Sequence, residues 1–346
     1  MKAFAALLLP FLAMYCPGNE YRIESTSSSP AIAQRVSTEL APILEKHDFQ
    51  GALQISGGRL DGAKFEVGYL WPWASVTKQV VAVMVMQEVE AGKLALDVPV
   101  STYLNDWPMG GREAPTLRQL LQHQSGLYDP EDDAGFVWDT AAPIDPMMCV
   151  AQRQTAPGGA FNYNNCDFLL VGRILEASTG TDMPTLFETR FRKPLQMKKA
   201  RFAYSRILLG PTTGRPGAEG IEHYGAAGGL VGTPEDLLKF DRALMSGKLL
   251  SEQSRAEMWR GDPDLGYTAL GQWDATLPLA GCSEPVRIIE RRGAIDGYQA
   301  RNFILPDLGI AIVAFVGRSE GEYNFGEPWS QSGLSYELLS AAACGA

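Results

Sequence analysis

The chain has 346 residues, with 40 acidic and 30 basic side chains, a formal net charge of −10 and 45% hydrophobic residues. A chain of this length can bury roughly three quarters of the surface that it exposes when unfolded, so it needs no metal or disulfide to hold a core. The ordinary composition excludes disordered, collagen-like and coiled-coil proteins. The acidic balance argues against a nucleic-acid partner, because neutralising phosphates takes clustered Lys and Arg.

Residues 1–33 predict a secretory signal peptide followed by a linker. Lys2 precedes an apolar run from Ala3 to Tyr15, which is too short to span a bilayer and is typical of an export signal. An untidy N-terminal tail is the alternative. Since no later segment offers a membrane-spanning run, we expect a periplasmic or secreted protein with a single domain over residues 34–346.

The first elements of this domain are expected to be a helix, a hairpin and a buried helix. Apolar residues at helical spacing predict a helix from Ile32 to about Lys46, bent or shortened by Pro42. Two short strands over 52–56 and 64–69, with glycines in the turn between them, predict a hairpin. A helix is expected from Ser75 to Ala91, with Gly92 as its C-cap, and because its stretch Val80–Met86 is apolar on nearly every face it should lie inside the protein.

The remainder of the chain is mostly helical and then turns to strands. We expect helices over 116–122, 168–178, 183–191 and 234–246, strands over 286–292, 298–305 and 309–316, and a final helix over 334–343. Strands at both ends of a helical middle predict an α+β fold, an antiparallel β-sheet flanked by N- and C-terminal helices. The sheet lobe would take about 34–74 and 266–346, and an inserted helical lobe about 75–265.

The cysteines and histidines give little sign of a metal site. Five cysteines are spread along the chain without Cys-x-x-Cys spacing, and the three histidines lie far apart. We therefore expect a metal-independent protein without a cofactor. The cysteines favour buried or idle thiols, with a disulfide such as Cys149–Cys166 as the alternative.

The first chemical motif is Ser75-Val76-Thr77-Lys78, at the start of the buried helix. A serine and a lysine three residues apart share one helix face, and such a pair can activate a hydroxyl nucleophile. The unpaired N–H groups of the first helical turn could face a developing oxyanion. The alternative is a capping serine beside a surface lysine.

A lysine alone is a poor base at pH 7, because its ordinary pKa is about 10.4. A second titratable group would share the task, and Tyr163-Asn164-Asn165 offers a phenol in a turn before an apolar helix. Tyr103-Leu104-Asn105 has the same Tyr-x-Asn form but lies in a segment that predicts packing. Packing and turn formation are the alternative for both segments.

The third motif is Arg291-Arg292-Gly293, followed by Ala294, at a strand end. A glycine in a strand lets a ligand or another backbone approach closely. The adjacent Arg291 could hold a substrate carboxylate with two hydrogen bonds. An edge-strand charge pair followed by a turn is the alternative.

The order Ser-x-x-Lys, Tyr-x-Asn, basic-x-Gly resembles that of the serine β-lactamase and penicillin-binding-protein superfamily, and most of all its class C β-lactamase-like group. The resemblance runs from about residue 50 to 340. The sequence also resembles that of the group over residues 74–79, 92–97, 116–127, 228–230, 233–237 and 297–298. The group includes β-lactamases, D,D-carboxypeptidases, D-amino-acid peptidases and esterases.

The resemblance implies a role for each motif residue. Ser75 would be the nucleophile, and Lys78 and Tyr163 would act together as base and proton shuttle. Asn165 would hydrogen-bond the lysine and the substrate. The N–H groups of Ser75 and Ala294 would form the oxyanion hole, and the substrate would be a small molecule or peptide.

Some features depart from the pattern of this group. The third motif usually has Lys-Thr-Gly or His-x-Gly, and an arginine can bind an anion but cannot shuttle protons. The loop before Ser75 is short, so Trp71 and Trp73 either pack or form an aromatic pocket for an apolar acyl group. These departures place esters and D-amino-acid peptides or amides ahead of β-lactams as substrates.

Two rivals to an acyl-enzyme on Ser75 remain at this point. One is a catalytically silent module that binds peptidoglycan-like ligands or penicillin without turnover. The other is a Ser-His-Asp hydrolase that uses His123 or His223, although the resemblance gives the stretch around His123 a structural role. The oligomeric state is not predicted by the sequence.

Overall fold

The protein is described from a computed structural model. It describes residues 22–25, 29–66, 69–108, 113–136, 144–152, 155–204, 209–210, 212 and 220–345. The predicted signal peptide lies outside these residues.

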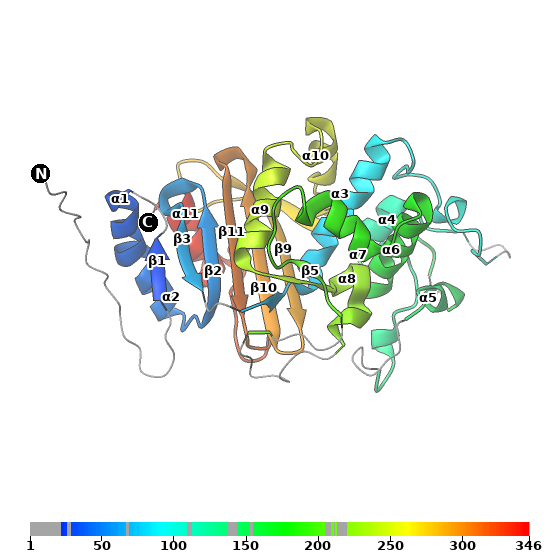
Figure 1. Ribbon diagram of the computed structural model, residues 1–346, viewed down its shortest axis with the longest axis horizontal. Helices are drawn as coiled ribbons and strands as arrows, with labels where there is room; N and C mark the ends of the chain where they lie inside the picture. Colours follow the sequence, from blue (N-terminus) through cyan, green and yellow to red (C-terminus); the bar gives the residue numbers. More distant parts are fainter. Residues whose placement is uncertain are drawn as a thin grey trace, which may run out of the picture.

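An eight-stranded antiparallel sheet forms the centre of the molecule, in the order β1-β3-β2-β11-β10-β9-β8-β7 (Figure 1). The strands are β1 (Arg22–Ser25), β2 (Gly51–Ser56), β3 (Ala63–Glu66), β7 (Thr268–Ala269), β8 (Gln272–Leu277), β9 (Val286–Ile295), β10 (Tyr298–Leu305) and β11 (Ile310–Val316). Three strands come from the N-terminal part of the described chain and five from its C-terminal part. This arrangement confirms the predicted α+β fold.

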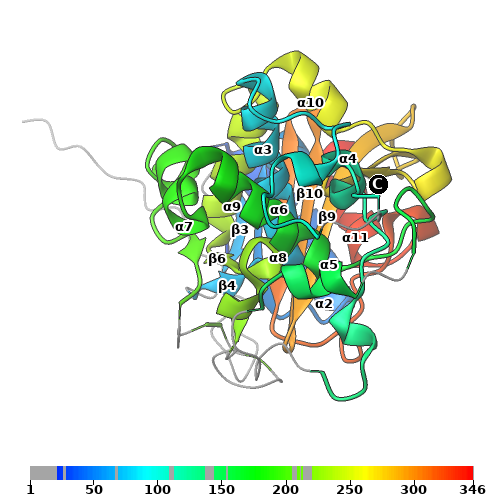
Figure 2. The same ribbon diagram turned by 90° about the vertical axis from the view of Figure 1, so that its right-hand side faces the viewer.

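Helices cover both faces of the sheet. α1 (Pro30–Arg35), α2 (Ala41–Lys46) and α11 (Leu334–Ala343) pack on one face. The other face carries α3 (Thr77–Glu90), α4 (Leu117–Leu121), α5 (Met147–Ala151), α6 (Asn165–Thr179), α7 (Met183–Phe187), α8 (Gly225–Gly228), α9 (Pro234–Met245) and α10 (Glu252–Met258). Figure 2 shows this helical half from the front. A small sheet of β4 (Trp71–Pro72), β6 (Leu230–Gly232) and β5 (Arg201–Phe202) lies within it.

The core is divided into two clusters by the sheet, and β11 shows why. Ile310 and Ile312 belong to the cluster under α1, α2 and α11, whereas Val313 and Phe315 belong to the cluster around α3. Successive side chains of a strand point to opposite faces. A continuous apolar strand such as β11 therefore needs helices on both sides.

The main predicted elements are confirmed. The β2–β3 hairpin, the fully buried α3 and the final α11 lie where the sequence places them. The first predicted helix is divided into α1 and α2 by a π-helical turn over Val36–Leu40, and Pro42 is the second residue of α2. The strand β1 was missed because it lies in the segment predicted as a linker, and that part of the linker prediction is wrong. The strands β7 and β8 were missed because they are short or only half buried.

Trp71 and Trp73 pack inside the protein. Trp71 stacks on Phe315 with ring centroids 5.9 Å apart, and Trp73 meets Phe187 edge-on at 6.4 Å. Both side chains are almost completely buried. The alternative of an aromatic pocket at the rim of the site is therefore wrong.

The expectation of idle thiols is also wrong. Cys149 is bonded to Cys166, and Cys282 to Cys344. The first pair is the alternative that the sequence analysis named. The spacing of cysteines along a chain carries no information on their distance in the fold, which is why the sequence did not decide the pairing.

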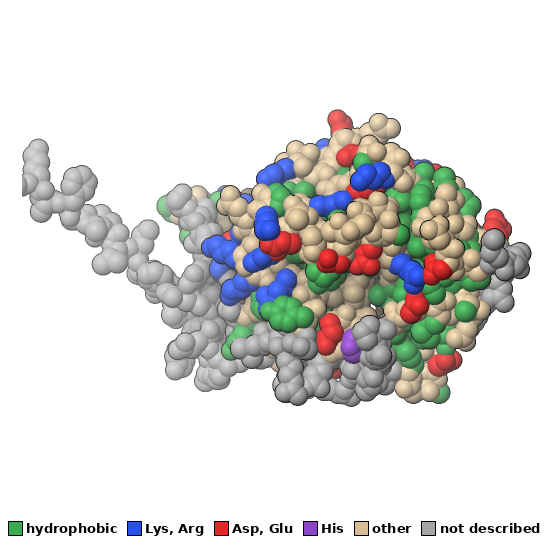
Figure 3. Space-filling model, turned by 45° about the vertical axis from the view of Figure 1, so that its right-hand side comes forward, with side chains coloured by type: hydrophobic (Ala, Val, Ile, Leu, Met, Phe, Trp, Pro, Cys, Tyr) green, Lys and Arg blue, Asp and Glu red, His purple; other side chains and the backbone are tan. Residues whose placement is uncertain are grey.

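The face in Figure 3 carries Lys and Arg side chains interspersed with Asp and Glu. The ion pair Lys239–Glu235, 3.0 Å long, is partly exposed, and such pairs contribute little to stability. In the described part of the chain, no helix combines the length and the apolar character that crossing a bilayer requires.

A polar network joins α3 to α9 through Asn302 on β10, on one face of the sheet. Asn302 on β10 donates 2.9 Å hydrogen bonds to Gln79 Oε1 and Asp241 Oδ1, and Gln79 donates to Gln272 Oε1 at 2.6 Å. Asp241 is completely buried. Burial raises the pKa of its carboxyl from 3.8 to about 8.

This shift predicts that stability falls with rising pH. Because the folded state holds a proton that the unfolded state releases, stability present below pH about 4 is lost progressively up to pH about 8. Asp241→Asn should remove this loss and raise the free energy of unfolding at pH 8 by several kcal/mol, since each unit of pKa shift corresponds to about 1.4 kcal/mol. Urea unfolding at several pH values measures it, with the exposed Asp264→Asn as control. Equal pH slopes in Asp241→Asn and wild type would contradict the assignment.

Candidate active site

Ser75 lies in a 3-10 turn, η3 (Ala74–Val76), that leads directly into α3. Ala74 just before it has φ +46°, a left-handed conformation that costs energy for a residue with a side chain. Such strain is common at functional sites. Lys78, one turn later, shares the face of Ser75 and is completely buried.

The Lys78 amine has three polar neighbours. Nζ donates hydrogen bonds of 2.7 Å to Asn165 Oδ1 and to the backbone oxygen of Ala227, and lies 3.1 Å from Ser75 Oγ. The first two oxygens can only accept, so each needs an N–H of the amine. In the neutral amine both N–H groups are then used, and the lone pair is left for the hydroxyl of Ser75. This arrangement would allow Lys78 to accept a proton from Ser75.

Tyr163 approaches the same hydroxyl from the turn before α6. Its Oη lies 2.5 Å from Ser75 Oγ, and Lys78 Nζ lies 4.8 Å from its ring centroid. Arg291 on β9 donates from Nη2 to Tyr163 Oη at 3.1 Å and from Nε to the backbone oxygen of Ser75 at 2.8 Å. Thus Ser75, Lys78 and Tyr163 converge, although they are distant along the chain.

The environment lowers the pKa of both candidate bases. Burial lowers the pKa of Lys78 to about 8, and the charge of Arg291 acts in the same direction. Burial alone would raise the pKa of Tyr163, but the positive charges of Lys78 and Arg291 outweigh it and lower the pKa. Each base is thus brought nearer to neutral pH.

The geometry does not favour the expected binding of a substrate carboxylate by Arg291. Two of its N–H groups are directed at protein oxygens, on Ser75 and Tyr163. The next residue, Arg292, is paired with Glu290 and Glu327. Arg291 is therefore placed to act on Tyr163.

Gly293 explains how β9 reaches the nucleophile. A Cβ on Gly293 would lie 2.7 Å from the backbone nitrogen of Ser75 and 2.7 Å from the oxygen of Trp73. Only a glycine permits this approach. Ala294, the expected second oxyanion donor, follows at once and is exposed.

A second glycine brings the Ala227 carbonyl to Lys78. A Cβ on Gly172 of α6 would lie 2.7 Å from Cβ of Ala226 on α8. The two helices therefore pack closely, and α8 can present Ala227 to the amine. The sequence analysis missed this acceptor, since a backbone oxygen leaves no side-chain signal.

Glu131 was also missed. Its Oε1 accepts a 2.6 Å hydrogen bond from Asn165 Nδ2, so Asn165 joins Lys78 on one side to a carboxylate on the other. Glu131 lies in a 3-10 turn, η5 (Pro130–Asp132), within an acidic run. Such a run is typical of a solvated loop, which is why it gave no functional signal.

His123 lies behind Tyr163, with ring centroids 4.5 Å apart. Its Nδ1 accepts from the N–H of Asn164 at 3.3 Å and lies 3.0 Å from Asp167 Oδ2. Burial, with the nearby charges of Lys78 and Arg291, holds the pKa of His123 well below its usual range, and burial raises that of Asp167.

The remaining sequence candidates lie elsewhere or in other roles. The hydroxyl of Tyr103 accepts from the N–H of Ala95 at 2.9 Å, and its ring packs against the core, as expected of a segment that predicts packing. His223 belongs to a 3-10 turn, η7 (Ile221–Tyr224). Among the residues that the structure describes, no group of three or more His, Cys, Asp or Glu side chains could hold a metal ion.

Fold and site define the class of the protein, the serine β-lactamase and penicillin-binding-protein superfamily. The sequence model of the family described as Beta-lactamase matches residues 54–331. The chain belongs to this family.

Several named proteins are similar to the chain in sequence. The chain is 24% identical over 299 residues to a D-aminopeptidase of Cereibacter sphaeroides, covering 80% of this chain and 56% of the relative. It is 26% identical over 276 residues to the D-alanyl-D-alanine-carboxypeptidase/endopeptidase AmpH of Escherichia coli (strain K12), covering 71% and 70%. The chain spans about half the length of two curated relatives that it matches.

Solved structures show the same fold. A D-stereospecific amidohydrolase from a Streptomyces species superimposes with a TM-score of 0.70 at 23% identity, over 92% of this chain and all of the other. At this identity the likeness establishes the fold alone.

The position of Arg291 predicts the pH dependence of nucleophile activation. Arg291→Gln removes a charge that lowers the pKa of Tyr163 and of Lys78, so both should rise. The pH at which a fluorophosphonate begins to modify Ser75 should move upward, with about tenfold slower modification below it for each unit. Arg292→Gln, the paired neighbour, is the control. An unchanged pH profile for Arg291→Gln would show that Arg291 does not act on the bases.

Proposed function

We propose that the protein is a serine hydrolase that forms an acyl-enzyme on Ser75. The observation that carries the proposal is the meeting of Ser75 Oγ with Tyr163 Oη at 2.5 Å and Lys78 Nζ at 3.1 Å. Few structural roles require a buried lysine, a phenol and a hydroxyl to converge. The names of the relatives, a D-aminopeptidase and a carboxypeptidase among them, agree with hydrolysis.

The steps follow from the contacts. Ser75 Oγ gives its proton to the Tyr163–Lys78 pair and bonds to the substrate carbonyl carbon. The proton then passes to the leaving amine or alcohol as the carbonyl–leaving-group bond breaks, which leaves the acyl-enzyme. A water that loses its proton to the same pair attacks the acyl carbon, and Ser75 recovers its proton as the acid departs.

The developing oxyanion would be held by two backbone N–H groups, those of Ser75 and Ala294. The tight approach of Gly293 to the Ser75 nitrogen supports this assignment, because it brings the strand that carries Ala294 against the nucleophile. Asn165 would position both the amine and the substrate.

Ser75→Ala tests the nucleophile. Turnover of a p-nitrophenyl ester or of D-alanine p-nitroanilide should fall by about 10⁶-fold, to the background rate, since losing the nucleophile disables the whole unit. Mass spectrometry of the wild type after a fluorophosphonate or a fluorescent penicillin should find an adduct on Ser75. Full activity in Ser75→Ala would contradict the mechanism. If the wild type shows no turnover and no labelled Ser75, the result favours the silent binding module.

We propose substrates that carry a free ammonium group, with D-amino-acid amides and peptides first. Glu131 supports this, because its carboxylate is hydrogen-bonded to Asn165, which also holds Lys78. A substrate ammonium on this side of the site would meet a fixed opposite charge. The D configuration rests on the names of the D-aminopeptidase and the D-stereospecific amidohydrolase. Small esters are the second substrate class.

Glu131→Gln tests this preference. The variant should lose about fivefold in kcat/KM for D-alanine p-nitroanilide, the effect of about 1 kcal/mol expected of an exposed ion pair. N-acetyl-D-alanine p-nitroanilide lacks the charge and should be unaffected, so the ratio of the two rates is the measurement. A ratio equal to that of the wild type would remove Glu131 from substrate recognition.

We also propose that the protein is exported to the periplasm or secreted. The apolar run from Ala3 to Tyr15 supports export. So do the two disulfides, because such bonds persist in oxidising compartments.

A further inference from the structure

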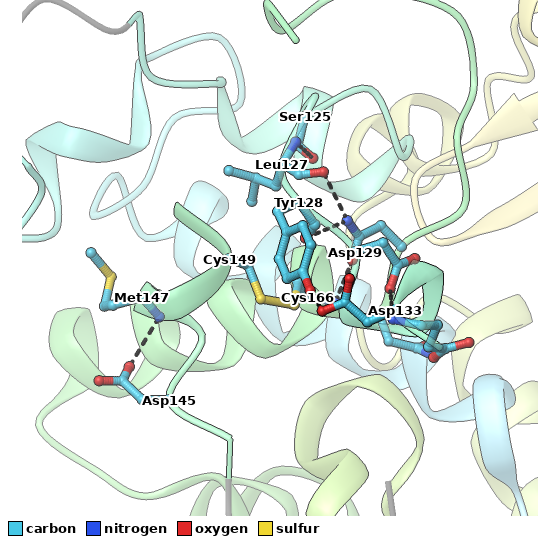
Figure 4. Close-up of a disulfide and its surroundings, with 12 residues drawn as sticks. Ser125, Leu127, Tyr128, Asp129, Asp133, Asp145, Met147, Cys149 and Cys166 are labelled. Atoms are coloured by element: carbon cyan, nitrogen blue, oxygen red, sulfur yellow. Dashed lines mark hydrogen bonds between the residues drawn. A yellow bond between two sulfur atoms is a disulfide. The ribbon is translucent and has the colours of Figure 1, made fainter. Parts of the chain in front are cut away.

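The disulfide Cys149–Cys166 lies directly beside the candidate active site. Cys166 follows Asn165 in the first turn of α6, whereas Cys149 belongs to the short helix α5. Both side chains are completely buried. Figure 4 shows the sulfur–sulfur bond close to Leu127 and Tyr128, in the segment that leads to Glu131.

Among the described residues, the helix α5 also contacts the core through Val150 and Met147. Of its five residues only Cys149 and Val150 are buried. The ion pair between Asp145 and Arg173, 2.8 Å long, also joins this region to α6, but its side chains are 67% and 34% exposed. Exposed pairs contribute little. The covalent bond is therefore a principal tie between α5 and α6.

The first turn of α6 in turn holds the segment that leads to Glu131. The side chain of Asn164, its N-cap, accepts from the N–H of Cys166 at 2.8 Å. The same side chain donates to the backbone oxygens of Leu127 at 3.2 Å and Tyr128 at 3.1 Å. A shift of Cys166 would thus move both Asn164 and the segment that it holds.

Asn165 connects this turn to the catalytic amine, since it contacts Lys78 and Glu131 together. Ser75 and Tyr163 have further anchors that do not involve the disulfide. Arg291 holds Tyr163 Oη and the backbone of Ser75. The disulfide is therefore connected more directly to Asn165 and the Glu131 turn than to the nucleophile Ser75.

We propose that Cys149 and Cys166 are positioning residues, whose bond fixes Asn165 and the Glu131 turn for ammonium-bearing substrates. The bond joins residues 17 apart in sequence, and the loop that it closes contains both Tyr163 and Asn165. Closing such a loop removes conformational freedom from the segment. The inference rests on the proposed function and adds which residues position its ammonium-bearing substrates.

The chain provides a matched control. Cys282–Cys344 joins the loop between β8 and β9 to the end of α11, on the opposite side of the sheet. Its removal should affect stability without touching Asn165 or Glu131. A difference between the two disulfides then reports position, and not the loss of a cross-link as such.

The experiment compares Cys149→Ala/Cys166→Ala with Cys282→Ala/Cys344→Ala, well below the Tm of each. For D-alanine p-nitroanilide, the first variant should raise KM about tenfold, whereas its rate on p-nitrophenyl acetate should change less than about threefold. The control should keep both sets of constants. Unchanged constants in the first variant, or equal losses on both substrates, would overturn the proposal.

Two further measurements keep the outcome decisive. If the first variant does not fold, dithiothreitol treatment of the control variant leaves only Cys149–Cys166 to be reduced. The bond takes two electrons and two protons from one dithiol, which becomes a cyclic disulfide, and the same rise in KM is expected. If the wild type shows neither turnover nor a Ser75 adduct, the proposed function fails, and this inference fails with it.

Discussion

The candidate active site depends on one buried amine, that of Lys78. Lys78 is completely enclosed, and two of its three neighbours, Asn165 Oδ1 and the Ala227 carbonyl, can only accept hydrogen bonds. Burial disfavours the charged form, while these acceptors fix the direction of the amine. The remaining direction points to Ser75 Oγ. A surface lysine would have neither the lowered pKa nor the fixed orientation.

Much of the surrounding structure holds this arrangement in place. The apolar α3 keeps water from Lys78, Gly172 lets α8 bring its carbonyl close, and Gly293 lets β9 come up to Ser75. Arg291 adds a fixed charge next to Tyr163. In the usual form of the third motif a lysine or histidine stands here, and the arginine cannot exchange its proton. In the proposed mechanism its role is then electrostatic, and proton transfer is assigned to Tyr163 and Lys78.

Much of the fold could be predicted from hydrophobic periodicity. The stretch Val80–Met86 of α3 is apolar and buried, and β10 and β11 are joined by a clear turn. The motif residues could be named because Ser75, Lys78 and Tyr163 carry reactive side chains in a known order. Periodicity could not reveal β8, whose residues are mostly half buried and so lack a strong pattern.

Other parts of the site left no usable pattern. Ala227 acts through its backbone, and Glu131 lies in an acidic run that would suit any solvated turn. Both depend on tertiary packing, which brings them to Lys78 and Asn165 from distant elements. The Cys149–Cys166 bond is of the same kind, because only the fold brings α5 to the start of α6.

The most direct test of the central claim is the titration of Lys78 itself. In protein labelled with ¹³C-lysine, the Cε resonance of Lys78, assigned by its loss in Lys78→Arg, can be followed by NMR from pH 6 to 11. The account predicts a midpoint near 8. A midpoint at the ordinary value of about 10.4 would contradict it, because the amine would then be charged at neutral pH and could not accept the proton of Ser75.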